Sequence, residues 1–234
     1  QAGTLAQESH PAFAVQECTK DGCLDIQGSI VMDMQWRWLH NKEAYENCLG
    51  AAGWDAELCP DAATCSRNCA LEGLLPNDYS QTYGVDAIDG GVKLHYVAPK
   101  GAVASRVYLL EDENKYRMFK LKNREFTFTT DLSTLPCGLN AALYFVEMPQ
   151  DGGYDGDLNT AGAKYGTGYC DAQCPKDVKF ISGEANSKNW NSTSDPPVGH
   201  YGACCMEMDI WEANSMSTAY TPHPCNTVGA ERCE

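Results

Sequence analysis

Short apolar runs, bounded by glycine, proline, asparagine and aspartate, follow one another along the chain, whereas helical periodicity is scarce. Apolar and polar residues alternate in EFTFTTDL, as in a strand with one buried face. The pattern predicts strands over 29–38, 92–97, 105–110, 116–122, 125–132, 142–148 and 179–183. It predicts short helices, held by disulfides, over 42–48 and 59–70. Many short strands between turn signals indicate a single all-β domain, a sandwich or a jelly roll, without internal repeats or a linker.

The segment CCMEMDIWE, which ends at Glu212, departs from strand alternation at one residue. Glu207 and Asp209 are two apart, so a strand places both acids on one face and the apolar residues on the other. Glu212 is two residues after Ile210 and four after Met208, so strict alternation would place it on the apolar face. Either it faces the core, which is costly for an unpaired charge, or a β-bulge near Ile210 and Trp211 returns it to the acidic face.

Charge and hydropathy exclude several classes of partner. The formal net charge of −15 argues against binding to nucleic acid or to an anionic membrane, because phosphate binding relies on clustered Lys and Arg. No apolar run approaches the ~20 residues that cross a bilayer, so we expect no membrane span. A neutral substrate is easier to reconcile with this charge, although acidity alone also keeps a protein in solution.

Thirteen cysteines, several at short spacings, predict disulfides and an oxidising compartment. A zinc site built from Cys170, Cys174 and the pair Cys204–Cys205 is the alternative, but adjacent cysteines fit a tetrahedral site poorly. Asn191-Ser-Thr is a glycosylation sequon in a polar loop, which also indicates secretion. The chain opens QAGTLAQESH, without a basic start or an apolar stretch, so we interpret it as the mature form of a secreted, extracellular protein.

The glycine-rich loop 151–170 contains Asp151, Asp155 and Asp157. A calcium site is one interpretation, but the spacing does not follow an EF-hand loop. The GAKYGTG portion lacks the Lys-Ser or Lys-Thr that ends a phosphate loop. We therefore interpret the loop as a long ordered turn, and we expect neither a metal ion nor another cofactor.

Two sets of residues indicate carbohydrate chemistry. Trp36 and Trp38 are two apart, so a strand would place both rings on one face, either in the core or as a platform for sugar rings. Hydrolysis of a glycosidic bond commonly uses one carboxylate as nucleophile or base and a second, kept protonated, as acid. If Glu207, Asp209 and Glu212 converge, repulsion raises at least one of their pKa values. A lectin would need the tryptophans but not this acid cluster.

Five longer motifs resemble glycoside hydrolase family 7, a family of secreted cellulases of the cellobiohydrolase and endoglucanase types. They are MQWRWLH, LPCGLNAALYFVEM, NTAGAKYGTGYCDAQCPKDVKF, CCMEMDIWEANS and TPHPC. The resemblance runs from end to end of the chain. It implies a concanavalin-like β-jelly-roll whose concave sheet forms a groove or tunnel, with cellulose and cello-oligosaccharides as binding partners. It also implies hydrolysis with retention of anomeric configuration.

Carried over residue by residue, the resemblance makes Glu207 the nucleophile, Asp209 the carboxylate that orients it, and Glu212 the general acid/base. We expect the Glu207 and Glu212 carboxyl groups to lie ~5–5.5 Å apart, as in a retaining pair. His223 matches a histidine that lines the site near the leaving-group side.

The resemblance also assigns residues that contact the sugar chain. Trp36 and Trp38 match two sugar platforms toward the non-product end of the groove. The polar groove residues implied in the same way are Arg106, Asn140, Tyr144, Asp171, Gln173 and Lys179.

The cysteine pattern of the family implies five disulfides and a longer protein. The implied pairs are Cys18–Cys23, Cys48–Cys69, Cys59–Cys65, Cys170–Cys205 and Cys174–Cys204. Gly3 and Ala70 replace two cysteines that often pair in the family. Cys137, Cys225 and Cys233 then lack partners, and full domains of the family are nearly twice as long. We therefore expect residues 1–234 to be the N-terminal part of one longer catalytic domain, with hydrolysis requiring the missing portion.

Loop lengths bear on whether the enzyme attacks chain ends or internal bonds. The stretches DIWEAN and LNAALYF resemble the cellobiohydrolase type, whereas the loops 97–105 and 189–202 are shorter than those of a typical tunnel-forming enzyme. We favour a monomeric, processive cellobiohydrolase with a partly open tunnel. The alternatives are an endo-β-1,4-glucanase of the same family, a non-catalytic glucan-binding module and a disulfide-stabilised structural protein.

Overall fold

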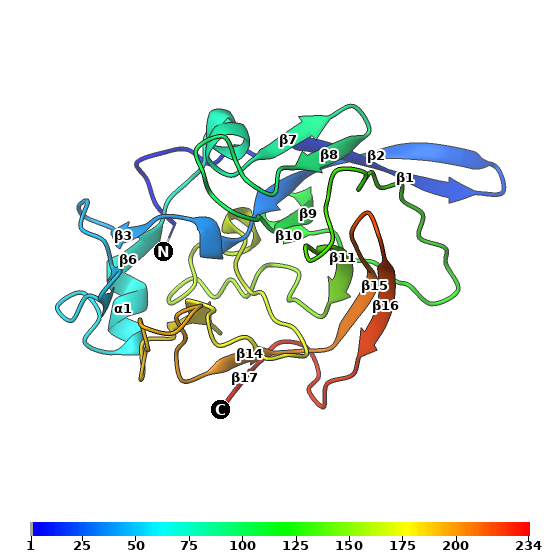
Figure 1. Cartoon of the computed structure of the whole chain (residues 1–234). Helices are drawn as coiled ribbons and strands as arrows, with labels where there is room; N and C mark the ends of the chain where they lie inside the picture. Colours follow the sequence, from blue (N-terminus) through cyan, green and yellow to red (C-terminus); the bar gives the residue numbers. More distant parts are fainter. Residues whose placement is uncertain (1) are drawn as a thin grey trace.

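The computed structural model describes residues 2–234, which form mainly short antiparallel strands. The largest sheet has the strand order β1-β2-β9-β10, and a second has the order β11-β15-β16. In Figure 1 the β1–β2 hairpin and the β11–β15–β16 sheet lie on one side of the molecule, and α1 lies on the other. The strands of the two sheets are β1 (Ala12–Thr19), β2 (Gly22–Met32), β9 (Val107–Asp112), β10 (Lys115–Tyr116), β11 (Ala141–Val146), β15 (Glu207–Ala213) and β16 (Thr218–His223).

Two-stranded ladders and short helical segments form the rest of the described chain. The ladders are β3 (Leu39–Asn41) with β6 (Cys69–Leu71), β4 (Leu49–Gly50) with β5 (Gly53–Trp54), β7 (Val85–Ile88) with β8 (Gly91–Leu94), β12 (Phe180–Ile181) with β13 (Glu184–Ala185), and β14 (Gly202–Cys204) with β17 (Glu231–Cys233). The helical segments are the α-helix α1 (Ala62–Asn68), the 3-10 helices η1 (Met34–Trp36) and η3 (Ala163–Tyr165), and the π-helix η2 (Asp78–Thr82).

The inner end of β2 is buried on both faces. Ile30 and Met32 pack into a cluster with Leu74 and Tyr79, whereas Val31, between them, faces a larger cluster on the opposite side of the strand. This double burial explains why the sequence there is a continuous apolar run and not an alternating one. The outer half of β2 pairs with β1, a strand that the sequence pattern does not predict.

Side-chain caps determine where α1 begins. The Asp61 carboxylate accepts a hydrogen bond from Thr64 N (2.8 Å), which satisfies a free N–H of the first turn. The predicted helix over 59–70 is thus confirmed in its central part. The predicted helix over 42–48 is wrong, because Asn41 N donates to Glu46 O (2.7 Å) and closes a tight loop instead.

A predicted strand is confirmed where another strand pairs with the apolar run. The runs 92–97, 105–110 and 142–148 contain most of β8, β9 and β11, and 179–183 contains β12. In 29–38 the strand ends at Met32, because the Asp33 carboxylate accepts a hydrogen bond from Gln35 N (2.6 Å) and begins η1. The predicted strand over 33–38 is therefore wrong.

The run 116–132 departs furthest from its predicted structure. Only its first residue lies in a strand, so the strands predicted over 116–122 and 125–132 are wrong. The alternating rings do find an apolar surface: Phe126 packs against Phe145 (5.1 Å between ring centroids) and Phe128 against Trp211 (6.0 Å). No other segment of residues 2–234 forms a ladder with 125–132, and alternation cannot supply the backbone partner that a strand needs.

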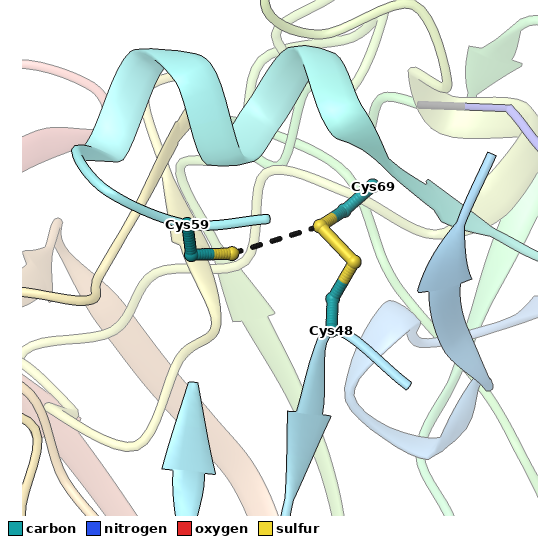
Figure 2. A group of neighbouring side chains, drawn as sticks. All are labelled: Cys48, Cys59 and Cys69. Carbon is teal, nitrogen blue, oxygen red and sulfur yellow. Dashed lines mark hydrogen bonds between the residues drawn. A yellow bond between two sulfur atoms is a disulfide. The ribbon is translucent and has the colours of Figure 1, made fainter. Parts of the chain in front are cut away.

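Disulfides hold the segments around α1 and before β15. All five pairs implied by the family pattern are present, and Cys137, Cys225 and Cys233 are free. Figure 2 shows the Cys48–Cys69 disulfide with the Cys59 sulfur 3.7 Å from that of Cys69. Cys59 is itself bonded to Cys65, so this cluster presents no thiolate to a metal ion. The disulfides at Cys170, Cys174, Cys204 and Cys205 likewise exclude the zinc interpretation of those residues.

Within residues 2–234, no helix is both long enough and apolar enough to cross a membrane.

Candidate active site

A β-bulge in β15 lies between Asp209 and Glu212. Toward β16, Asp209 pairs with Thr221 but Glu212 pairs with Ala219, so three steps along β15 match two along its partner. Toward β11 the register shifts at the same place, and Ile210 is left without an opposite residue. The bulge that the broken alternation predicts is therefore present.

Glu207, Asp209 and His223 form a compact group at one end of the β15–β16 ladder. Glu207 and Asp209 are 8% and 4% exposed, and one ligand atom from each of the three side chains lies within 4.8 Å of the others. The His223 Nε2 atom lies 3.0 Å from Asp209 Oδ2, and Asp209 also hydrogen-bonds Glu207. Such a group could hold a metal ion, but its own hydrogen bonds already account for the close spacing.

The third carboxylate, Glu212, lies beyond the bulge. Its Oε1 accepts a hydrogen bond from Asn140 Nδ2 (2.9 Å), from the residue just before β11. Its charge acts on Asp209, where it is the second cause of a raised pKa after burial. Glu212 therefore lies within electrostatic range of Asp209, as expected if the bulge turns it toward that face.

Burial and like charge raise the pKa of two of the carboxyl groups. The pKa of Glu207 rises to about 7, first because the side chain is buried and second because Asp171 places a negative charge nearby. The pKa of Asp209 is also raised, by burial and by Glu212. The charge of His223 opposes both shifts. At mildly acidic pH the cluster therefore retains a proton that isolated carboxyl groups would lose.

The segment 170–174 lies against the start of β15 and contributes to the site. The disulfides Cys170–Cys205 and Cys174–Cys204 join it to residues just before Glu207. The Ala172 N–H donates to Glu207 Oε2 (3.2 Å), so a backbone dipole favours the charged form of Glu207. The side chain of Gln173 is exposed and makes no hydrogen bond to the described residues.

A second group of residues surrounds η1. The Arg106 guanidinium forms an ion pair with buried Asp33 (Nη2 to Oδ2, 2.7 Å) and lies over the ring of Tyr169, 3.3 Å from its centroid. Lys179 Nζ donates to the backbone oxygen of Gln35 (2.6 Å), and its burial lowers its pKa to about 8. These cations line the segment that carries Trp36.

Tyrosine side chains connect the two groups. The Tyr144 hydroxyl lies 3.3 Å from that of Tyr169, and the backbone of Tyr144 pairs with Asp209 across the β11–β15 ladder. The Tyr169 hydroxyl in turn donates to Asp171 Oδ2 (2.6 Å). The sequence did not single out Tyr169 or Asp33. The signal for Asp33 was available, because a charge inside the apolar run 30–34 needs a buried partner.

The two tryptophans differ from the predicted arrangement. Trp36 is the last residue of η1 and Trp38 follows it, so neither lies in a strand or on the sheet of Glu207, and the shared-face prediction is wrong. Trp36 is partly buried and donates through Nε1 to Ala104 O (3.0 Å). Trp38 is 38% exposed, and its ring stacks on His40 at 4.1 Å between centroids. The two rings are therefore not both core residues.

The sequon residue Asn191 is exposed. Its Oδ1 accepts hydrogen bonds from the backbone N (3.1 Å) and the hydroxyl (2.8 Å) of Thr193. Its own backbone pairs with Val198 across the loop. The amide nitrogen of the side chain makes no hydrogen bond to the described residues.

Comparisons with known proteins agree with this geometry. The model of the family described as glycosyl hydrolase family 7 matches residues 2–234. A cellobiohydrolase of this family from Daphnia pulex is 46% identical with a TM-score of 0.94, and the match covers 100% of this chain and 54% of that one. A cellobiohydrolase from Melanocarpus albomyces complexed with cellotetraose is 40% identical with a TM-score of 0.86, covering 100% and 55%. The endocellulase EGI of Humicola insolens is 39% identical with a TM-score of 0.86, covering 100% and 56%.

These similarities confirm the predicted all-β jelly-roll fold. They also show that the chain spans about half of the length of the solved structures that it matches. Cellobiohydrolases and an endocellulase match equally completely, so overall similarity does not separate the two types.

Proposed function

This chain belongs to glycosyl hydrolase family 7, and we propose that it supplies the nucleophile-bearing part of a domain that hydrolyses β-1,4-glucosidic bonds. The observation that carries the proposal is the bulge in β15 between Asp209, which lies beside Glu207, and Glu212, whose charge acts on Asp209. A non-catalytic glucan-binding module has no need for such a cluster, because crowding carboxylates costs stability. We therefore favour an enzyme over a binding module.

In the proposed mechanism, Glu212 protonates the glycosidic oxygen while Glu207 attacks the anomeric carbon. The bond to the leaving sugar breaks and a covalent glycosyl-enzyme forms. Water, deprotonated by Glu212, then displaces Glu207 and releases a sugar with retained configuration. Asp209 and the Ala172 N–H orient Glu207, and His223 supports Asp209.

We infer that the substrate is cellulose and its soluble fragments. The cellobiohydrolase from Melanocarpus albomyces is similar over the whole chain, and that protein was solved with cellotetraose. The exposed ring of Trp38 offers a face for a sugar ring. Arg106 and Lys179 are the groove cations carried over from the family pattern.

Within the family, we favour a processive cellobiohydrolase that releases cellobiose. The stretches DIWEAN and LNAALYF support this type, and the short loops 97–105 and 189–202 support a partly open tunnel. An endo-β-1,4-glucanase is the alternative. The products separate the two, because a processive enzyme releases mainly cellobiose whereas an endo-acting enzyme first releases mixed oligosaccharides.

We also propose that the functional protein is secreted, monomeric and longer than this chain. Five disulfides support an oxidising compartment. The match to about half of each solved structure supports a longer catalytic domain, as do the three free cysteines.

Asn191 is the proposed glycosylation site, supported by its exposure and its sequon. In a secreting host, Asn191→Gln and Thr193→Ala should each remove one glycan mass from the purified protein. Ser192→Ala, at the variable position of the sequon, should leave that mass unchanged. An identical mass for wild type and Asn191→Gln would refute this assignment.

The decisive experiment incubates the full-length protein with crystalline cellulose and with cellopentaose, and identifies the released sugars and their anomeric form by proton NMR. We expect cellobiose as the main product and the β-anomer as the first form released. Glu207→Gln should abolish release but retain binding, because an amide keeps the shape and cannot attack. Initial release of the α-anomer would refute the retaining mechanism.

A further inference from the structure

Asp171 has a different environment from that of a sugar-binding residue. The family pattern implies that it contacts substrate, yet its side chain is buried, with 8% exposure for the residue. Both carboxylate oxygens already accept hydrogen bonds from the protein: Oδ2 from the Tyr169 hydroxyl (2.6 Å) and Oδ1 from Gln173 N (2.8 Å). These two donors fix the orientation of the carboxylate, and its burial limits the access of a sugar hydroxyl to it.

The backbone fixes Asp171 next to the nucleophile strand. Its N–H donates to Ala203 O (3.2 Å) and its carbonyl accepts from Cys205 N (3.0 Å). The flanking disulfides reach Cys204 and Cys205, three and two residues before Glu207. The next N–H along this segment, that of Ala172, donates to the Glu207 carboxylate. The segment therefore has little freedom to move relative to Glu207.

Tyr169 is buried to the same degree, at 4% exposure, and its ring and hydroxyl have separate contacts. The ring lies under the Arg106 guanidinium and stacks on Tyr108, with 6.2 Å between ring centroids. Its hydroxyl reaches Asp171. Burial raises the pKa of Tyr169, so the hydroxyl remains a donor over the working pH range.

We propose that Tyr169 and Asp171 are positioning residues for the nucleophile: the Tyr169 hydroxyl fixes the Asp171 carboxylate, which with the Ala172 N–H sets the orientation and electrostatic surroundings of Glu207. This role rests on the proposed function only in taking Glu207 as the nucleophile. It differs from a sugar-binding role because Asp171 acts on the enzyme and not on the substrate.

The charges around Glu207 determine whether its pKa rises or falls when Asp171 or Tyr169 is substituted. The Asp171 charge raises the pKa of Glu207, so removing that charge should lower the pH at which Glu207 ionises. Loss of the Tyr169 hydroxyl should act in the same direction but more weakly, because the Asp171 carboxylate keeps its charge and loses one of the two hydrogen bonds that fix its position. The other titratable groups around the cluster, which the variants leave in place, are Asp209 and Glu212 on β15, His223 on β16 and Tyr144 on β11.

The test is a titration of the Glu207 carboxyl carbon by NMR in the full-length protein, with the signal assigned by its absence in Glu207→Gln. The variants are Asp171→Asn and Tyr169→Phe. Tyr116→Phe is the matched control: Tyr116 is equally buried, at 4% exposure, and its hydroxyl donates to Thr167 O (2.7 Å), away from Asp171. The same proteins are assayed for kcat and KM on a soluble cello-oligosaccharide.

We expect the Glu207 midpoint to fall by about one pH unit in Asp171→Asn, by less in Tyr169→Phe and not at all in Tyr116→Phe. We expect kcat to fall about tenfold in Tyr169→Phe with KM within twofold of wild type, as for a lost hydrogen bond to a charged group.

An unchanged midpoint in Asp171→Asn overturns the proposal, and so does a raised KM with unchanged kcat, which would make Asp171 a sugar ligand. If Tyr169→Phe does not fold, Asp171→Asn decides alone. Expected midpoints together with no hydrolysis by the wild type would refute the proposed function and leave the positioning pair standing.

Discussion

At the scale of single residues, the fold disfavours the charged form of Glu207, the proposed nucleophile. Burial and Asp171 raise its pKa from 4.5 to about 7, against the opposing effects of the Ala172 N–H and His223. The folded protein therefore binds this proton more tightly than the unfolded chain does. Stability from this group is present below pH 4.5 and is lost as the pH rises toward 7.

Glu207→Gln removes this pH-dependent cost. We expect the free energy of unfolding of the variant to exceed that of wild type by about 1–3 kcal/mol at pH 8, and the two to be similar at pH 4. Denaturant unfolding at both pH values measures the difference, with Glu57→Gln as an exposed control that should change neither value. A variant that is less stable than wild type at pH 8 would contradict the proposed electrostatics.

The exposed ring of Trp38 gives a prediction about substrate. Trp38→Ala should reduce the rate on crystalline cellulose severalfold and leave the rate on cellotriose nearly unchanged, because a distant stacking contact acts only on a long chain. Tyr154→Ala, another exposed aromatic residue at 55% exposure, serves as the control. Equal losses on both substrates would show that Trp38 acts through stability and not through sugar binding.

The carboxylates of β15 were easier to single out from the sequence than the contacts around them. The order of acidic and apolar residues over 207–212 predicted a bulge, because alternation along a strand can be followed in the sequence without knowing the partner strands. Asp171 was assigned to sugar binding, although the structure has both its oxygens occupied by protein donors. Such contacts depend on which segments meet in space, which spacing does not reveal.

At the scale of elements, strands on both sides hold β15 in place. β11 and β16 pair with it, and the disulfides at Cys204 and Cys205 tie residues just before it to the segment 170–174. The bulge, the disulfide pairs and helix α1 could all be predicted from local patterns or from the family pattern. The irregular backbone of 125–132 could not, because alternation there predicts a strand but does not show whether another segment pairs with it.

Removing the Cys170–Cys205 disulfide tests this support. The paired substitution Cys170→Ala and Cys205→Ala should cost about 4 kcal/mol of stability and also lower kcat, because Ala172 and Asp171 lose their fixed place beside Glu207. The matched control is Cys18→Ala with Cys23→Ala, at the end of the β1–β2 hairpin, which should cost about 2 kcal/mol and leave kcat unchanged. An unchanged kcat in the first pair would remove the segment from catalysis.

At the scale of the whole molecule, the chain spans about half of the length of the solved structures that it matches. Its residues Cys137, Cys225 and Cys233 have no disulfide partner. Phe126 and Phe128 pack against β11 and β15 without forming a strand of their own. We proposed on these grounds that a longer polypeptide forms the functional domain.

Thiol titration tests that proposal. In the full-length protein under denaturing, non-reducing conditions, Cys137, Cys225 and Cys233 should not react with a thiol reagent, because each should be bonded to a cysteine beyond residue 234. Peptide mapping of the non-reduced protein should identify those partners. Three reactive thiols at these positions in active, full-length protein would contradict the proposal.

The central claim is that Glu207 forms the covalent intermediate, and a trapping experiment tests it most directly. A 2-deoxy-2-fluoro-cellobioside with a good leaving group slows breakdown of the glycosyl-enzyme more than its formation, so the adduct accumulates. Digestion and mass spectrometry of the full-length protein should place the fluorocellobiosyl group on Glu207, with no adduct in Glu207→Gln. An adduct on Glu212 or Asp209, or no adduct from an enzyme that hydrolyses cellopentaose, would contradict the account.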